Sequence, residues 1–174
     1  AHDDAIAVLR RALRGGAEQA VPWIEYGLLL DEAGRAEEAR AAYARGRDAD
    51  SNSAWAYGCL GWADLRAGKP LRTLWYSWRA YALDHRYADA LTIRGLAHER
   101  LGFDGASATT LDQAIALEPR RSWATLERAR QLAASGARDD ARALLSRYRA
   151  TAPDDVAVSN ALRALASTDS ESDD

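Results

Sequence analysis

Glycine recurs with a period of 34 residues along most of this chain. One column consists of Gly34, Gly68, Gly102 and Gly136. A second column, seven residues earlier, consists of Gly27, Gly61, Gly95 and finally Ala129. A fixed period of this length indicates one supersecondary unit that is repeated, because each unit alone cannot bury its apolar face and must stack on its neighbours.

Composition indicates that the repeated unit is helical. The 174 residues include 39 alanines but only four valines, four isoleucines and one phenylalanine. Alanine is the strongest helix former, whereas β-branched and aromatic residues are enriched in strands. We therefore expect two helices per unit with the glycine of the first column between them, because glycine adopts the left-handed conformation that ends many helices.

Four units fit this register and predict an all-α protein, a right-handed α-solenoid of helix-turn-helix units. The units comprise residues 20–53, 54–87, 88–121 and 122–155. Residues 1–19 should contain one helix, which is either the second helix of a truncated unit or a solitary cap. Residues 156–166 should form a capping helix, and the acidic segment 167–174 should be disordered because it has no apolar residue.

These columns resemble the tetratricopeptide repeat, a 34-residue unit in which tryptophan, Leu-Gly, tyrosine, alanine and proline recur at set positions. The matching residues here are Trp23 with Gly27, Tyr57 with Leu60 and Gly61, and Ala114 with Pro119. The resemblance implies a scaffold or adaptor for protein–protein interaction, in which the first helices of the units line a concave groove for a partner peptide or helix. It does not identify the partner.

The resemblance also implies which residues line the groove. Several are tryptophan or arginine, which are frequent hot spots of protein interfaces. The expected groove residues are Ile24, Leu28, Trp55, Trp62, Leu65, Arg66, Leu96, Arg100, Trp123, Leu126 and Arg130. An alternative for Leu28 and Trp62 is that they only pack between neighbouring first helices.

Some members of the family grip the C-terminal carboxylate of a peptide with asparagine and lysine in this groove. The corresponding positions of the first two units here are Glu25, Leu28, Cys59 and Trp62. The only lysine of the chain, Lys69, is in a turn. A carboxylate clamp is therefore not expected.

A second surface is expected on the second helix of unit 54–87. Trp75 and Trp78 stand at positions that are polar in the family and that hold alanine, threonine, aspartate or serine in the other units. Two exposed tryptophans favour a convex protein interface, such as a homodimer, because exposed aromatic surface is costly. The alternative is that neighbouring side chains cover both rings. Arg72 and Arg79 are expected to stack on them by cation–π contact.

No motif predicts catalysis, a cofactor or a metal site. The histidines His2, His85 and His98 have no helical pairing, and His98 is expected in or near the core. A lone cysteine, Cys59, usually behaves as a small apolar residue. We therefore expect a chain without enzyme activity, cofactor or bound metal.

Charge and hydropathy restrict the partners. The formal charge is −3, and the last six residues contribute four negative charges, so the rest of the chain is nearly neutral. This distribution does not favour nucleic acid binding, and no apolar run reaches the roughly 18 residues of a membrane span. Arginine outnumbers lysine 22 to 1, a bias typical of GC-rich bacterial coding sequences. The sequence fits the cytoplasm, and a processed periplasmic protein is an alternative.

Three functional hypotheses follow. The first is a non-catalytic scaffold that binds a partner segment in the groove. The second is a self-assembling scaffold in which Trp75 and Trp78 join copies and the groove accepts a terminal helix of a neighbour. The third is the regulatory repeat domain of a larger enzyme.

Overall fold

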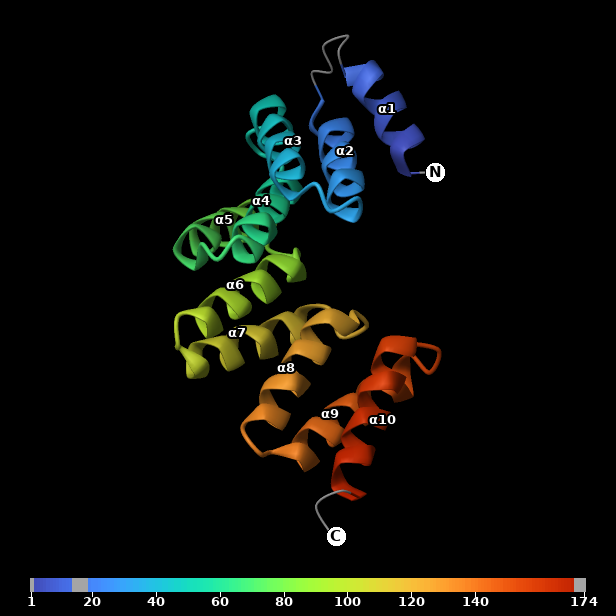
Figure 1. Ribbon diagram of the computed structural model, residues 1–174. Helices are drawn as coiled ribbons and strands as arrows, with labels where there is room; N and C mark the ends of the chain where they lie inside the picture. The colour runs from blue at the N-terminus through green and yellow to red at the C-terminus, as the bar shows by residue number, and fades with distance from the viewer. Residues whose placement is uncertain (1, 14–18, 171–174) are drawn as a thin grey trace.

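A computed structural model describes residues 2–13 and 19–170, and these residues form ten helices and no strands. Consecutive helices run antiparallel and stack in sequence order, so that α1 and α10 lie at opposite ends of the molecule (Figure 1). The helices are α1 (His2–Leu13), α2 (Ala20–Glu32), α3 (Ala36–Ala49), α4 (Ala54–Arg66), α5 (Pro70–Leu83), α6 (Ala88–Arg100), α7 (Asp104–Leu117), α8 (Ser122–Ala134), α9 (Arg138–Thr151) and α10 (Val156–Ser170). The all-α solenoid predicted from the repeat is confirmed.

The turn inside each unit is built on the first glycine column. Gly34, Gly68, Gly102 and Gly136 have φ angles of 75°, 69°, 77° and 88°. The residue after each glycine donates its backbone N–H to a carbonyl of the preceding helix, as Arg35 does to Leu30 at 2.8 Å. This is the Schellman arrangement, which satisfies the last carbonyls of a helix and needs a left-handed residue.

The second glycine column lies where the two helices of a unit cross. In unit 54–87 the hydroxyl of Thr73 on α5 donates to the carbonyl of Gly61 on α4 at 3.2 Å. In unit 88–121 Ser107 on α7 donates to the carbonyl of Gly95 on α6 at 2.7 Å. The small residues on both sides of the crossing, Gly61 and Gly95 on one helix and Thr73 and Ser107 on the other, allow this close approach of the two backbones.

The two ends of the array differ in how they extend the repeat. Helix α1 packs on α2 through the buried residues Ile6 and Leu13, whereas residues 14–18 lie outside the described part of the chain. Helix α10 continues to Ser170, four residues past its predicted end, because no glycine or proline stops it. The segment 167–170 is therefore helical rather than disordered, and residues 171–174 lie outside the described residues.

No helix within residues 2–13 and 19–170 has both the length and the hydropathy that crossing a membrane would require.

Candidate functional site: the groove

The first helices of the units form one continuous face. Helix α4 contacts both α2 and α6, and α8 contacts both α6 and α10. Three pockets lie along this face. The middle pocket shares Trp62 with the pocket on its α2 side and Arg130 with the pocket on its α10 side. We call this face the groove, and its pockets the aromatic, the charged and the terminal pocket.

The aromatic pocket has a volume of about 380 Å³ and joins helices that are distant in sequence. Trp62 of α4 and Trp123 of α8 meet edge to face, with ring centroids 5.2 Å apart. Trp55, at the start of α4, is 37% exposed. The lining residues are Leu28, Tyr43, Trp55, Gly58, Cys59, Trp62, Tyr87, Asp89, Ile93, Arg121 and Trp123.

An ion pair gives this pocket its polar side. Arg121, just before α8, donates through Nη2 to Oδ2 of Asp89 in the first turn of α6. The other oxygen, Oδ1 of Asp89, is buried and has no hydrogen-bond partner among the described residues. Burial raises the pKa of Asp89 above its usual range, and the positive charge of Arg121 opposes this shift only in part.

A glycine makes room for Tyr87 in this pocket. A Cβ atom at Gly58 would lie 2.5 Å from the hydroxyl oxygen of Tyr87 and 2.6 Å from its ring. Only a residue without a side chain therefore lets Tyr87 approach α4 this closely, as in other sites of close packing.

The charged pocket, of about 300 Å³, follows along the groove. Glu99 accepts hydrogen bonds from Arg130 at 2.6 and 2.8 Å and from Gln131 at 3.0 Å. Burial opposes the ionisation of Glu99, but these hydrogen bonds outweigh it, so the pKa of Glu99 is lowered. The lining residues are Trp62, Leu65, Arg66, Leu96, Glu99, Arg100, Glu127 and Arg130.

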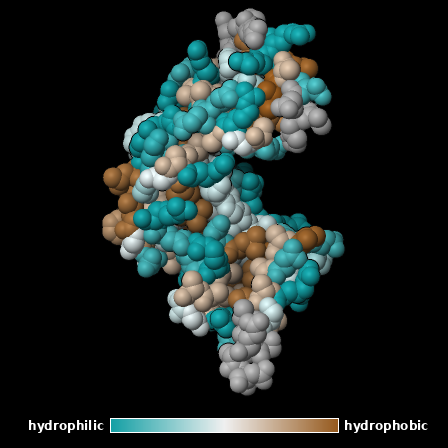
Figure 2. Space-filling view, in the orientation of Figure 1, coloured by the Kyte–Doolittle hydropathy of each residue, from teal (hydrophilic) through white to brown (hydrophobic). Residues whose placement is uncertain are grey.

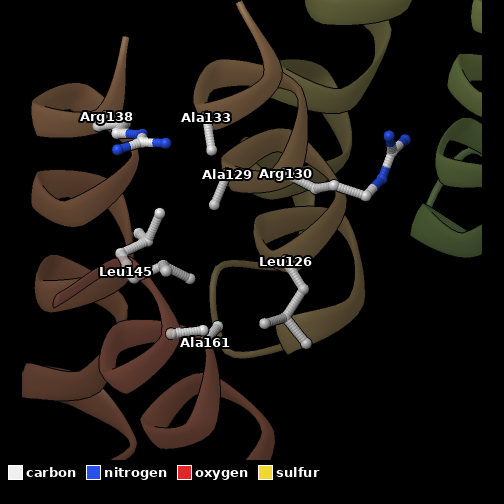
Figure 3. Close-up of a pocket in the computed structure, with 9 residues that line it drawn as sticks. Leu126, Ala129, Arg130, Ala133, Arg138, Leu145 and Ala161 are labelled. Carbon is white, nitrogen blue, oxygen red and sulfur yellow. The ribbon is translucent and has the colours of Figure 1, made fainter. Parts of the chain in front are cut away.

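The terminal pocket, of about 330 Å³, lies where α8, α9 and α10 meet and is mainly apolar. Figure 2 shows hydrophobic residues gathered in a hollow of this region. In Figure 3, Leu126 and Ala161 point into the space between α8 and α10, whereas the guanidinium of Arg130 points away from it. This pocket can hold an apolar side chain, because its walls offer leucine and alanine surface.

The structure places ten of the eleven expected groove residues in these three pockets. Leu28, Trp55 and Trp123 line the aromatic pocket, and Leu126 lines the terminal pocket. The remaining six are Trp62, Leu65, Arg66, Leu96, Arg100 and Arg130, which line the charged pocket.

Ile24 is the exception, and its assignment to the groove is corrected. Its side chain is 0% exposed and belongs to the core. It faces α3, since a Cβ atom built at Gly46 would lie 3.0 Å from Ile24 Cγ1. A partner in the groove therefore cannot reach it.

Seven lining residues of the aromatic pocket are not among the expected groove residues, and two of them, Tyr87 and Arg121, share one position of the repeat. Both are the last residue of their 34-residue unit, immediately before a first helix. The groove positions that the family resemblance implies all lie inside the helices, so they do not include this column. The last position of each unit lies next to the start of the following first helix, and this is the signal that could have identified both residues.

The convex surface is exposed as expected, but its arginines are placed differently. Trp75 and Trp78 on α5 are 53% and 55% exposed. The predicted stacking of Arg72 and Arg79 on these rings is not observed. Arg72 forms an ion pair with Asp64 at 3.1 Å, and the Arg79 guanidinium lies 5.7 Å from the ring centroid of Tyr57.

The side chains with chemical reactivity are embedded in packing contacts. Cys59 is buried, and burial raises the pKa of its thiol to about 12. His98 is half-buried, and burial lowers the pKa of its imidazole; its Nδ1 lies 3.4 Å from the Thr110 hydroxyl. Among the described residues, no group of three His, Cys, Asp or Glu side chains is arranged to hold a metal ion.

Comparison with known proteins identifies the same architecture. The sequence profile of the Tetratricopeptide repeat family matches residues 103–165. A comparison with curated proteins finds no match. A thermophilic TPR protein of Thermus thermophilus is similar in structure, with a TM-score of 0.82 and 20% identity over 94% of this chain and 90% of that one.

Two further solved structures are similar. MamA has a TM-score of 0.68 and 23% identity, over 82% of this chain and 84% of its own. The first TPR of Spaghetti (RPAP3), solved with a bound HSP90 peptide, has a TM-score of 0.62 and 25% identity, over 69% of this chain and 95% of its own.

Proposed function

Because this chain is a tetratricopeptide repeat protein, we propose that it is a non-catalytic scaffold that binds an extended segment of a partner protein along the groove. The observation that carries the proposal is the continuity of three pockets along one face. An extended segment can place successive side chains into such pockets, which is how peptide recognition gains specificity. The HSP90 peptide bound to the similar RPAP3 domain supports this use of the fold.

The chemistry of the pockets indicates how the segment is held. Trp55 and Trp123 offer aromatic surface at one end of the groove, and the terminal pocket offers aliphatic surface at the other. Between them, Glu99 and Glu127 already pair with Arg130, and Arg66 pairs with Asp31, so this middle part orients the segment more than it anchors it. The first two units hold Glu25, Leu28, Cys59 and Trp62 where carboxylate-gripping members of the family hold asparagine and lysine. The proposed segment is therefore an internal stretch of the partner rather than its C-terminus.

Alanine at Trp55 and Trp123 together should weaken partner binding about tenfold or more, because the anchors lose their buried aromatic area. Random peptides displayed on phage can be selected on the immobilised wild-type chain, synthesised, and titrated against both proteins by calorimetry. Circular dichroism checks that the double variant keeps its helices. Trp75→Ala with Trp78→Ala serves as the matched control, since it removes two tryptophans outside the groove. Equal affinity of wild type and the groove variant would overturn the proposal.

Self-assembly through α5 is a second candidate, favoured by the exposure of Trp75 and Trp78 together with Leu71, which is 71% exposed. Exposed apolar groups of this size mark many interaction sites. If copies associate here, Trp75→Glu with Trp78→Glu should convert the assembly to a monomer of 19.0 kDa. Light scattering over a concentration series measures this change. A wild-type chain that is monomeric at every concentration would contradict the candidate.

A further inference from the structure

Oδ1 of Asp89 is an unsatisfied acceptor at the aromatic pocket, with no hydrogen-bond partner among the described residues. The Asp89 side chain is only 13% exposed, and its partner Arg121 bonds to the other oxygen, Oδ2. A buried carboxylate oxygen without a hydrogen bond costs free energy, because it has lost its water and gained no donor. Asp89 lines the aromatic pocket, so a donor that enters the pocket can recover this energy once the side chains that cover Oδ1 move aside.

The charges around Asp89 favour a positively charged donor. Glu118 lies 4.0 Å from Arg121, so the cluster of Asp89, Glu118 and Arg121 has one net negative charge. The adjoining walls are Trp55, Trp62 and Trp123, and the faces of tryptophan rings attract cations. Aromatic walls and a carboxylate together form a site for a cation on an apolar stem.

We propose that the aromatic pocket takes a lysine side chain of the bound segment, its stem between the tryptophans and its ammonium on Asp89 Oδ1. This assignment rests on the proposed binding of a segment in the groove. Lysine fits better than arginine, because Arg121 already occupies one oxygen and leaves a single acceptor. A guanidinium would lose its two-pronged pairing there, whereas an ammonium acts as a compact point donor.

The test uses three amino-acid amides: Nα-acetyl-lysine N-methylamide, its norleucine counterpart, which lacks only the ammonium group, and its arginine counterpart, which carries a guanidinium instead. Proton–nitrogen NMR follows the indole N–H signals of the six tryptophans during titration. The signals of Trp55, Trp62 and Trp123 should shift in a saturable manner, and those of Trp23, Trp75 and Trp78 should not. The lysine probe should bind about tenfold more tightly than the norleucine probe, and more tightly than the arginine probe.

Two variants of the ion pair should act in opposite directions. Asp89→Asn removes the charge at constant size and should weaken lysine binding about tenfold. Arg121→Gln frees the second oxygen of Asp89 and should strengthen it. A role of this pair in folding alone would not produce opposite effects on binding. Asp112→Asn, at an exposed carboxylate that pairs with Arg128, should leave binding unchanged.

Three results would each overturn the lysine assignment: norleucine binding as tight as lysine binding, unchanged binding by Asp89→Asn, or absence of shifts at Trp55, Trp62 and Trp123. The proposed groove function is judged separately, by the affinity of selected peptides for the variant with alanine at Trp55 and Trp123. Peptide binding that needs these tryptophans but not Asp89 would leave the scaffold function in place and remove the lysine.

Discussion

Replacing both Arg40 and Arg72 with methionine should lower the free energy of unfolding by about 3–5 kcal/mol, because the substitution leaves a carboxylate buried without a cation. The carboxylate is that of Asp64 on α4, whose side chain is 0% exposed. Arg40 of α3 donates through Nε to Asp64 Oδ1 at 2.7 Å, and Arg72 of α5 lies 3.1 Å from Oδ2. Urea unfolding followed by circular dichroism measures the loss.

The opposite substitution, Asp64→Asn, should cost less. The side chains of Arg40 and Arg72 are 23% and 51% exposed, so both guanidinium groups can reach water when the carboxylate is removed. Adding Asp64→Asn to the double arginine variant should therefore restore most of the lost stability. Failure of this rescue would show that the arginines stabilise the fold through their apolar stems rather than through the buried charge.

A matched pair of arginines controls for the general loss of positive charge. Arg128 and Arg142 pair with Asp112 and Asp139, whose side chains are 58% and 98% exposed. Replacing these two arginines with methionine should change the free energy of unfolding by about 1 kcal/mol or less, because both carboxylates remain hydrated. A loss as large as that at Arg40 and Arg72 would contradict the role assigned to the burial of Asp64.

The helices and turns could be predicted from the sequence because their causes are local and repeated. Each of the four turn glycines ends a helix of its own unit, so the 34-residue period was enough to locate the turn. The ion pairs could not be predicted in this way. Arg40 and Asp64 are 24 residues apart, and Asp89 and Arg121 are 32 apart, so each pair depends on how one unit stacks on the next.

In the groove, too, some features could be predicted from the sequence and others could not. The face that each first helix presents was predictable, and this was sufficient for Trp55, Trp62 and Trp123. Ile24 was misplaced because its side chain turns toward α3, where it packs at Gly46, and the repeat pattern alone does not show this contact. Tyr87 was missed because its place in the pocket depends on the close approach that Gly58 permits on the preceding first helix.

The second glycine column is uniform in sequence over its first three units, yet its members differ in how much space they leave. A Cβ atom at Gly27 would lie 2.6 Å from Tyr43 Cδ1, inside the contact distance of two carbon atoms. At Gly61 the nearest atoms, on Ile93 and Tyr76, lie at 3.4 Å. The same substitution should therefore have opposite effects at the two positions.

Gly27→Ala should destabilise the chain by about 2–3 kcal/mol, because Tyr43 cannot move away. Its ring is 1% exposed, and its hydroxyl donates to Asp31 at 2.9 Å. Gly61→Ala should instead be neutral or stabilising by about 0.5–1 kcal/mol, since alanine loses less backbone entropy in a helix than glycine does. Urea unfolding of the two variants tests the difference.

Relief of the contact provides the stricter test of the clash at Gly27. Tyr43→Leu alone should destabilise the chain, because it removes buried ring surface and the hydrogen bond to Asp31. In combination with Gly27→Ala, the total loss should be smaller than the sum of the two single losses, since leucine leaves room for the new methyl group. If the two losses of unfolding free energy add exactly, Gly27 is required for a reason other than the Tyr43 ring. If Gly61→Ala destabilises the chain as much as Gly27→Ala does, the helix crossing tolerates no side chain in either unit.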